Sequence, residues 1–538
     1  MTDALAAAAK LKDQGNLEFR AKKYDEAISL YSSAITTIAP AIDPILYSNR
    51  AACFIALEKY QEALEDCRIA IGENPNHIKS LDRSYFCYTK LGKPREALVE
   101  RLAAKVVSGD AEQVYRRIQE GASTALDPIV GKLADQFLKA ETKKLADDES
   151  RLVFPDAFEM FWHFNYMHSP RHESTQSDGH ATVGTIEGEL LEVYKKLREH
   201  TYEAYVDAYH LVDKLIEKHQ TGDNDNKELK TAYEVRGSFN YLLKREQQAI
   251  ADFKRSDNSS SVLLKLATTT SNSSEKLSYI EQAKAANKDD PRIDFFQGLM
   301  RYEAGEYEPA ISSFKKARDV SKAAADDATE LISSLYLTYA YWKSKKHALA
   351  RSELGALQKS RPGHPRVSAV TATIEGDGAS NAEKIRLWEK VWEDVETLTK
   401  ANGYVTDTTP LMNIALIMLE TFMDEVGSGK RTVKEDNSDW EPILQVYRDA
   451  CEADPHSLQC RFGYAQMLSI VYTDAQFENI EENYRKALDL AAGGPAITKV
   501  LKDLLAHEVK VALYERYPGS LRPLINMVII SQGIRTEF

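Results

Sequence analysis

Five polar side chains in the first hundred residues have the types and the spacing of a carboxylate-binding site. They are Lys12, Asn16, Asn49, Lys79 and Arg83. Lys12 and Asn16 are four residues apart, and so are Lys79 and Arg83, so in a helix each pair occupies one face. Two lysines, an arginine and two amides supply hydrogen-bond donors, and the cations form charge-assisted bonds with carboxylates. We therefore predict that these residues hold a peptide carboxylate.

A repeated spacing places these residues on successive helices. Gly15, Ala51 and Tyr85 each precede an alanine by twelve positions, and a second alanine follows seven residues later. These alanines are Ala27, Ala63 and Ala97, followed by Ala34, Ala70 and Ala104. A helix-turn-helix repeat of ~34 residues has this spacing, because small residues let the two helices of a pair approach closely. All five polar residues fall on first helices, which favours one shared groove over five separate solvated helix faces.

Three stretches around these residues carry a family resemblance. KDQGN, YSNRAA and IKSLDR resemble the carboxylate-clamp tetratricopeptide domains of chaperone adaptors, over residues 4–107. The clamp residues of that family match Lys12, Asn16, Asn49, Lys79 and Arg83 one for one. The resemblance implies that the ligands are the C-terminal Glu-Glu-Val-Asp tails of cytosolic heat shock protein 70 and heat shock protein 90.

The repeat spacing returns in weaker form from Leu190 onward. It runs from Gly237 to Ala249 and from Gly298 to Ala310, with further units before Pro362 and near the C-terminus. We predict an all-α tetratricopeptide superhelix with a three-repeat N-terminal clamp and a longer C-terminal solenoid. The predicted domains are a clamp domain (1–109), a helical connector (110–187) and a degenerate solenoid that binds clients (188–538).

This arrangement extends the resemblance to most of the chain. A clamp, a linker with an FP…F…F…F run and a long degenerate solenoid are together similar to the cytosolic part of the seventy-kilodalton receptors of the mitochondrial outer-membrane import translocase. HTYEAYVDAYHLVDKLIEKH, YEVRGSFNYLLKREQQAIADFKRS and DPHSLQCRFGYAQM carry this likeness. It implies that the chain receives preproteins for import. Two alternatives stay open, a soluble cytosolic co-chaperone of the same chaperones with no import role and a constitutive protein-protein scaffold.

The expected location follows from the absence of a long apolar segment. No stretch of the sequence approaches the ~20 apolar residues that a membrane span requires, and the N-terminus has no signal-peptide pattern. Members of the receptor family carry an N-terminal transmembrane anchor, whereas this sequence begins at the first clamp helix. We expect a protein that is soluble in the cytosol, or that faces the cytosol at the mitochondrial outer membrane through an anchor outside this sequence.

Three further segments permit predictions. Phe158, Phe161, Trp162 and Phe164 form an apolar stripe at helical spacing, which we interpret as packing between two halves of the molecule. Residues 168–187 are polar and lack a hydrophobic period, so we predict a mobile loop. The apolar run LINMVII near the C-terminus is expected to cap the last repeat, with an interaction segment as the alternative.

Composition and motifs argue against other classes of protein. The net charge of -13 disfavours binding to nucleic acid. Five cysteines without a CxxC pair indicate buried reduced thiols rather than disulfides or a zinc site. His168 and His172 have helical metal spacing but no supporting ligand motif, so we expect no metal. GSGKRT at 427–432 lacks the leading glycine and the preceding strand of a phosphate loop. We therefore predict no cofactor, no catalytic residue and no enzymatic activity.

Overall fold

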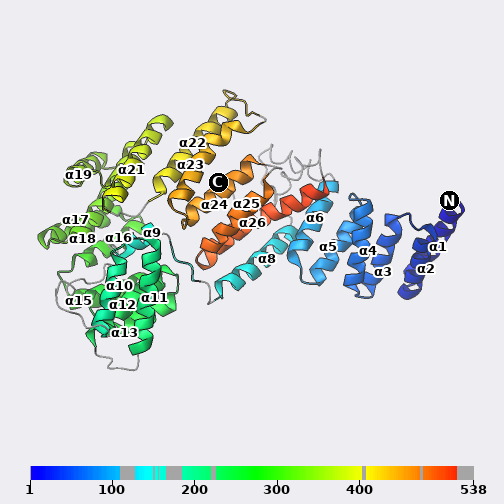
Figure 1. The fold of residues 1–538 in the computed structure, drawn as a ribbon, viewed down its shortest axis with the longest axis horizontal. Coiled ribbons are helices and arrows are strands. Elements are labelled where there is room, and N and C mark those ends of the chain that lie inside the picture. The colour runs from blue at the N-terminus through cyan, green and yellow to red at the C-terminus, as the bar shows by residue number, and fades with distance from the viewer. Residues whose placement is uncertain are drawn as a thin grey trace. The chain divides into compact units, whose positions relative to one another are not determined.

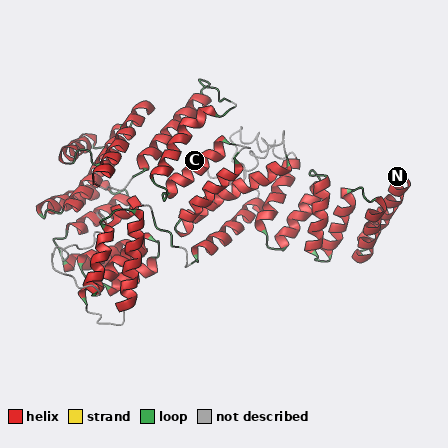
Figure 2. Ribbon diagram, viewed as in Figure 1, coloured by secondary structure: helices red, strands yellow, loops and turns green. Residues whose placement is uncertain are grey.

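The described part of the chain is built from helices and turns. The computed structural model describes residues 2–108, 128–148, 152–155, 157–164, 185–219, 226–402, 407–434, 436–472 and 476–517, and none of them forms a β-strand (Figures 1 and 2). The predicted all-α class is confirmed. The chain divides into two compact units, which we describe separately. Unit 1 comprises residues 1–151, 472–488 and 494–538, and unit 2 comprises residues 152–471 and 489–493.

Unit 1 begins with three consecutive helix pairs. They are α1 (Thr2–Arg20) with α2 (Tyr24–Ile38), α3 (Pro44–Ala56) with α4 (Tyr60–Glu73), and α5 (Ile78–Lys90) with α6 (Pro94–Ser108). The unit also contains α8 (Pro128–Ala146) and most of α25 (Phe477–Leu490) and α26 (Gly493–Arg516). Residues at the N-terminus of a helix favour its start, as α3 shows. The Asp43 side chain accepts a hydrogen bond from the Ile45 amide, and Pro44 occupies the first helical position.

The turn inside each repeat has the same backbone form. The residue seven positions after the start of each twelve-residue spacing has a positive φ. These residues are Lys22 (61°), Glu58 (59°) and Gly92 (69°) in unit 1, and Lys244 (59°) and Gly305 (77°) in unit 2. A left-handed residue at this point ends the first helix and reverses the chain, so the second helix packs back in a fixed register.

Close approach of the paired helices depends on the small residues of the spacing. A Cβ on Gly15 would lie 2.8 Å from Tyr31 Cε1, and a Cβ on Gly298 would lie 2.7 Å from two carbons of the Phe314 ring. In both pairs the aromatic ring comes sixteen residues after the glycine. The ring therefore fills the space that the missing side chain leaves, as the repeat spacing predicted.

The C-terminal helix α26 packs on the third repeat within unit 1. Leu505, Val509 and Leu513 are buried in one apolar cluster with Leu98 and Leu102 of α6. At the end of the helix Arg516 donates two hydrogen bonds of 3.0 Å to the Glu100 carboxylate, and Tyr517 donates one of 2.8 Å to the Pro75 carbonyl. The repeat spacing did not predict this grouping, and the functional boundaries at residues 109 and 187 stay a prediction.

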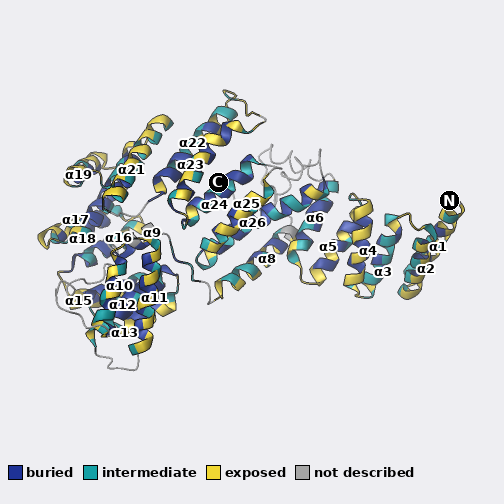
Figure 3. Ribbon diagram, viewed as in Figure 1, coloured by how far each residue is buried: buried dark blue, intermediate teal, exposed yellow. Residues whose placement is uncertain are grey.

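Unit 2 continues the helical hairpins. Its helices are α9 (Ala157–Trp162), α10 (Ile186–Leu197), α11 (Tyr202–His219), α12 (Lys227–Leu242), α13 (Glu246–Arg255), α14 (Ser260–Thr269), α15 (Ser273–Ala286), α16 (Pro291–Glu303), α17 (Tyr307–Ala323), α18 (Asp327–Lys343), α19 (His347–Ser360), α20 (Pro365–Glu375), α21 (Asn381–Asn402), α22 (Thr409–Gly427), α23 (Glu441–Ala453) and α24 (Leu458–Val471), with a short 3-10 helix at Ser438–Trp440. Figure 3 shows that most helices bury one face and expose the other, as amphipathic repeats require.

Several predicted segments have a definite outcome or lie outside the described residues. Trp162 and Phe164 pack against apolar clusters inside unit 2. For these two side chains the predicted packing between two halves of the molecule is therefore wrong. The end of the predicted mobile loop is wrong, because residues 186–187 form the first turn of α10. Nothing is described of the Phe158 and Phe161 side chains, of residues 165–184 or of LINMVII. Among the described residues, no helix combines the length and the apolarity that crossing a bilayer requires.

Candidate carboxylate-binding site

The five predicted residues lie on the first helix of each N-terminal pair. Lys12 and Asn16 are on α1, Asn49 is on α3, and Lys79 and Arg83 are on α5. Lys79 is exposed, and the other four side chains are partly exposed. All five therefore combine a fixed helical backbone with access to solvent. The predicted assignment to first helices agrees with the fold.

Two amides meet between α1 and α3. Asn49 Nδ2 donates a 3.2 Å hydrogen bond to Asn16 Oδ1, and the Tyr31 hydroxyl donates a second bond of 2.8 Å to the same oxygen. Both donors converge on Oδ1, so the network assigns the Asn16 Nδ2 hydrogens to the other side of the amide. These hydrogens are then available as donors for a ligand.

Arg83 is a partly buried cation without a carboxylate partner among the described residues. It donates a hydrogen bond to Ser48 Oγ, and Ser48 is 1% exposed. Burial lowers the pKa of Arg83, since the guanidinium has lost part of its hydration, while the neighbouring thiol groups of Cys67 and Cys53 act in the opposite direction. By contrast, Arg50 forms a bidentate pair with Asp66, at 2.9 and 2.7 Å. An arginine that has lost hydration without an ion pair is suited to receive an anion.

The surroundings of Arg83 are electropositive. Burial lowers the pKa of His77, and the charges of Arg83 and Lys79 lower it further. Neither Lys12 nor Lys79 forms an ion pair with another described residue. Lys12, Lys79 and Arg83 thus have no ion-pair partner among the described residues, in a chain whose net charge is -13. A peptide carboxylate would meet a local positive field here.

Two residues of this site were not predicted from the sequence as part of it. Tyr31 orients Asn16, and Ser48 accepts from Arg83. Burial raises the pKa of Tyr31 to about 12, so its hydroxyl stays protonated and remains a donor at neutral pH. The available signal was the position of Tyr31 sixteen residues after Gly15, which predicts contact between the paired helices but not a hydrogen bond.

The other candidate chemistry has structural explanations. All five cysteines are buried and free of disulfides, as predicted, and burial raises the pKa of Cys53 to about 12 and that of Cys87 to about 11. Such thiols are poor nucleophiles. In the loop that contains GSGKRT, Arg431 pairs with Asp439 at 2.9 Å and with Glu425 at 3.2 Å, which fixes a surface turn. No cluster of metal-ligating side chains occurs among the described residues, and His168 and His172 lie outside them.

Comparison with known proteins tests the resemblance. No family model matches the chain. Its sequence is 22% identical to the mitochondrial import receptor subunit TOM70 of Saccharomyces cerevisiae over 512 residues, which is 90% of this chain and 77% of that protein. The crystal structure of yeast Tom70 matches with a TM-score of 0.53 at 20% identity, over 94% of this chain and 96% of that one. The chain has the fold of a tetratricopeptide-repeat superhelix.

A shorter stretch is similar to a co-chaperone. The chain is 37% identical over 92 residues to the Hsp70/Hsp90 co-chaperone CNS1 of Saccharomyces cerevisiae, which is 17% of this chain and 24% of that protein. The chain thus resembles tetratricopeptide chaperone adaptors, and over most of its length it resembles TOM70, which confirms the predicted resemblance. These relatives are named as a receptor subunit and a co-chaperone, in agreement with the prediction of a binding protein rather than an enzyme.

Proposed function

We propose that the chain is a chaperone-docking adaptor whose clamp binds the acidic C-terminal tails of heat shock protein 70 and heat shock protein 90. The observation that carries this proposal is Arg83, a partly buried guanidinium that lacks a carboxylate partner among the described residues and bonds to Ser48, the neighbour of Asn49 in α3. The terminal and side-chain carboxylates of a Glu-Glu-Val-Asp tail have the complementary charge. The similarity to a protein named Hsp70/Hsp90 co-chaperone supports the same ligand.

Each residue has a separate role in this proposal. Lys12 and Asn16 on α1, with Asn49 on α3, bind the terminal carboxylate, while Lys79 and Arg83 on α5 bind a second carboxylate of the tail. A charge-assisted hydrogen bond contributes about 1.5–3 kcal/mol where it is well formed. After the loss of entropy on binding a flexible peptide, micromolar affinity follows, at a free energy of about -8 kcal/mol. An adaptor with this affinity can release its chaperone.

Calorimetry with a peptide that ends in Glu-Glu-Val-Asp tests the clamp. Arg83→Ala and Lys12→Ala should each weaken binding at least tenfold, whereas the helical circular dichroism should not change. Lys10→Ala is the matched control, because Lys10 is an exposed lysine two residues from Lys12 on a different face of α1. The same peptide with an amidated C-terminus should bind more weakly to the unaltered protein. Unchanged affinity of the Arg83→Ala protein would contradict the proposal.

We further propose that the chain receives preproteins for mitochondrial import on the cytosolic side of the outer membrane. The similarity to TOM70 over 90% of the chain supports this role. A cytosolic co-chaperone without an import role is the alternative, and the same clamp would serve both. Fractionation of cells that express the native gene product, together with capture of labelled preproteins by the full chain, separates them. The full chain is needed because residues 476–488 and 494–517 belong to unit 1.

A further inference from the structure

A short segment of unit 2 contacts helices of several repeats. We call residues 152–155 and 157–164 the inner segment; it contains α9. Three of its side chains are deeply buried: Met160 is 0% exposed, Phe164 3% and Phe154 4%. Phe164 contacts Phe239 of α12, with ring centroids 4.6 Å apart, and Phe154 contacts Tyr209 of α11 at 5.4 Å. One end of the inner segment is therefore held by aromatic rings of α11 and α12.

Trp162 connects the inner segment with helices of distant repeats. The Arg366 guanidinium of α20 lies over its indole ring, with Cζ 4.7 Å from the ring centroid. The same ring packs against the apolar cluster of Leu331, Leu335 and Val367, contributed by α18 and α20. Trp162 and Arg366 are about two hundred residues apart in the sequence, so the inner segment joins α11 and α12 to α18 and α20. It thus contacts several helices of the array at once, as a bound peptide does on a repeat protein.

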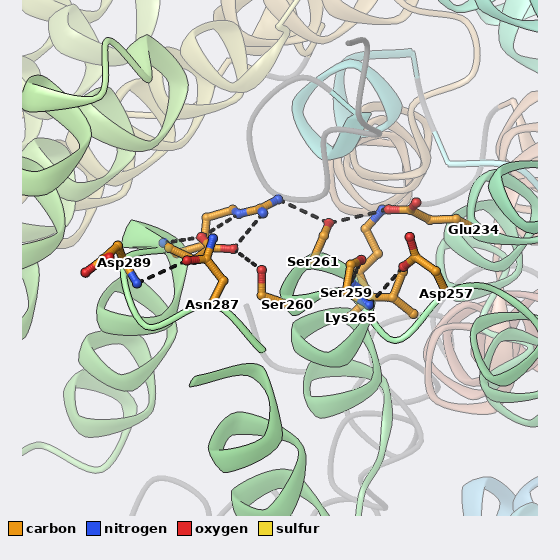
Figure 4. A network of polar contacts seen from close by, with 11 residues as sticks. Glu234, Asp257, Ser259, Ser260, Ser261, Lys265, Asn287 and Asp289 are labelled. Atoms are coloured by element: carbon orange, nitrogen blue, oxygen red, sulfur yellow. Dashed lines mark hydrogen bonds and ion pairs between the residues drawn. The ribbon is translucent and has the colours of Figure 1, made fainter. Parts of the chain in front are cut away.

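A buried network of charged side chains joins α12, α14 and α16 (Figure 4). Lys265 of α14 pairs with Glu234 of α12 at 2.6 Å, and Arg292 of α16 reaches Ser261 at 3.1 Å and Asp290 at 2.7 Å. Burial lowers the pKa of Lys265, in agreement with its exposed fraction of 1%. Burial lowers the pKa of His163 of the inner segment well below its usual range, and the charge of Lys265 lowers it further.

A buried charged network is not required to pack helices against one another. Removing charges from water costs several kcal/mol per ion, and well-packed apolar side chains of similar volume often stabilise a core at least as well. Charged groups are less costly if water reaches them part of the time, and release of the inner segment would remove the buried His163 from the neighbourhood of Lys265. The aromatic rings of α11, α12 and α18 would then form a mixed apolar and charged binding surface.

We propose that the inner segment is an internal ligand, and that an amphipathic helix of a client polypeptide with aromatic or methionine side chains three or four residues apart replaces it. The inner segment shows the chemistry that this surface accepts: Met160 and Phe164 are four residues apart, and Glu159 on the exposed side lies 4.0 Å from Lys244. The inference extends the client-receiving role proposed above and does not depend on the clamp. A client would then compete with the inner segment for the same surface of unit 2.

A peptide of residues 152–164 added in trans tests this inference. We expect weak binding to the unaltered full chain, and binding at least tenfold tighter to the Trp162→Ala, Phe164→Ala double variant, whose own segment is released. A peptide with the same two alanines is the control and should bind neither protein. Fluorescence anisotropy of a labelled peptide measures the affinity. Equal affinity for the two proteins would show that the inner segment is permanent core and would overturn the inference.

A milder variant covers the case in which the double variant loses helicity. Trp162→Ala alone removes the chain's own contact with Arg366 and keeps the packing of Phe164, so it should raise affinity for the peptide, whose tryptophan can take that contact, about threefold. An unchanged affinity in this folded variant would also overturn the inference. Capture of labelled preproteins by the full chain is measured in a separate experiment. Peptide binding without preprotein capture would refute the import role alone, and preprotein capture without peptide competition would refute the internal ligand alone.

Discussion

The Tyr31 hydroxyl donates a 2.8 Å hydrogen bond to Asn16 Oδ1, from the second helix of the first repeat to its first helix. This bond and the 3.2 Å bond from Asn49 to the same oxygen fix the orientation of the Asn16 amide. A residue that packs the two helices of the repeat thereby orients a residue of the candidate site. The stability of the helix pair and the geometry of the candidate site are linked through one side chain.

Tyr31→Phe should weaken binding of the acidic peptide about fivefold. The substitution keeps the ring that fills the space beside Gly15 and removes one hydrogen bond, which contributes about 1 kcal/mol. Calorimetry measures the affinity. Tyr24→Phe, on the same helix but without a hydrogen bond to the site, should bind like the unaltered protein. A Tyr31→Phe protein with unaltered affinity would show that Asn16 needs no help in orienting its amide.

Peptide affinity should fall as salt is added. The three cations are at least partly exposed, so screening acts on them directly at Debye lengths of ~10 Å and below. Between about 50 and 500 mM sodium chloride we expect the dissociation constant to rise several-fold, with a smaller rise for the amidated peptide. Titrations at four salt concentrations measure the slope. An affinity independent of salt would indicate a hydrophobic ligand instead.

Glycine-to-alanine substitutions should have opposite effects at two helical positions. Gly298→Ala places a Cβ 2.7 Å from the Phe314 ring, so it should destabilise the protein by about 1–3 kcal/mol. Gly355→Ala meets nothing within 4 Å and gains helix propensity, so it should stabilise α19 by about 0.5–1 kcal/mol. Urea unfolding followed by circular dichroism measures both. Loss of stability at Gly355 would contradict the packing described here.

The ion pair between Glu100 and Arg516 should hold α26 on the third repeat. Glu100→Gln leaves a largely buried guanidinium without its charged partner and should cost about 2–3 kcal/mol. Adding Arg516→Met should recover part of this loss, because the uncompensated charge is removed. Arg485→Met, which breaks exposed pairs, should cost less than about 1 kcal/mol. Hydrogen exchange of α26 reports the loss locally, and slow exchange in Glu100→Gln would contradict this role.

Stability of unit 2 should depend on pH through His364. Burial and the charges of Arg361 and Arg366 lower the pKa of His364 to about 4, and its neutral Nδ1 accepts the Arg366 amide at the start of α20. An unfolded histidine titrates near 6.5. Between these values the unfolded chain binds more protons, so the contribution is complete above about pH 6.5 and is lost as the pH falls toward 4. The loss should reach up to about 3 kcal/mol.

His364→Asn provides the comparison for the pH dependence. Asparagine keeps a side-chain acceptor at the N-cap and does not titrate, so melting temperatures between pH 4 and 6.5 should vary less than in the unaltered protein. His210→Asn, the same substitution at an exposed position of α11, is the matched control for the change of residue type. Parallel pH profiles of the His364→Asn and unaltered proteins would exclude His364 as the titrating group.

Local spacing was sufficient to predict the helices and the five residues of the candidate site. An interval of four residues places Lys79 and Arg83 on one helical face whatever the rest of the chain does. The twelve-residue interval from Gly15 to Ala27 likewise depends on contact between two adjacent helices. These features involve neighbours in the sequence, and the chain encodes them directly.

The tertiary structure decided the features that depend on distant contacts. The packing of Leu513 on Leu98, the pairing of Arg516 with Glu100 and the placement of Trp162 beneath Arg366 join residues hundreds of positions apart. No local period specifies such partners, because the stacking of successive repeats sets which helices meet. The sequence by itself thus determined the repeat and the residue types of the candidate site. Only the fold decided that Arg83 has no carboxylate partner among the described residues and that the inner segment packs on α11, α12, α18 and α20.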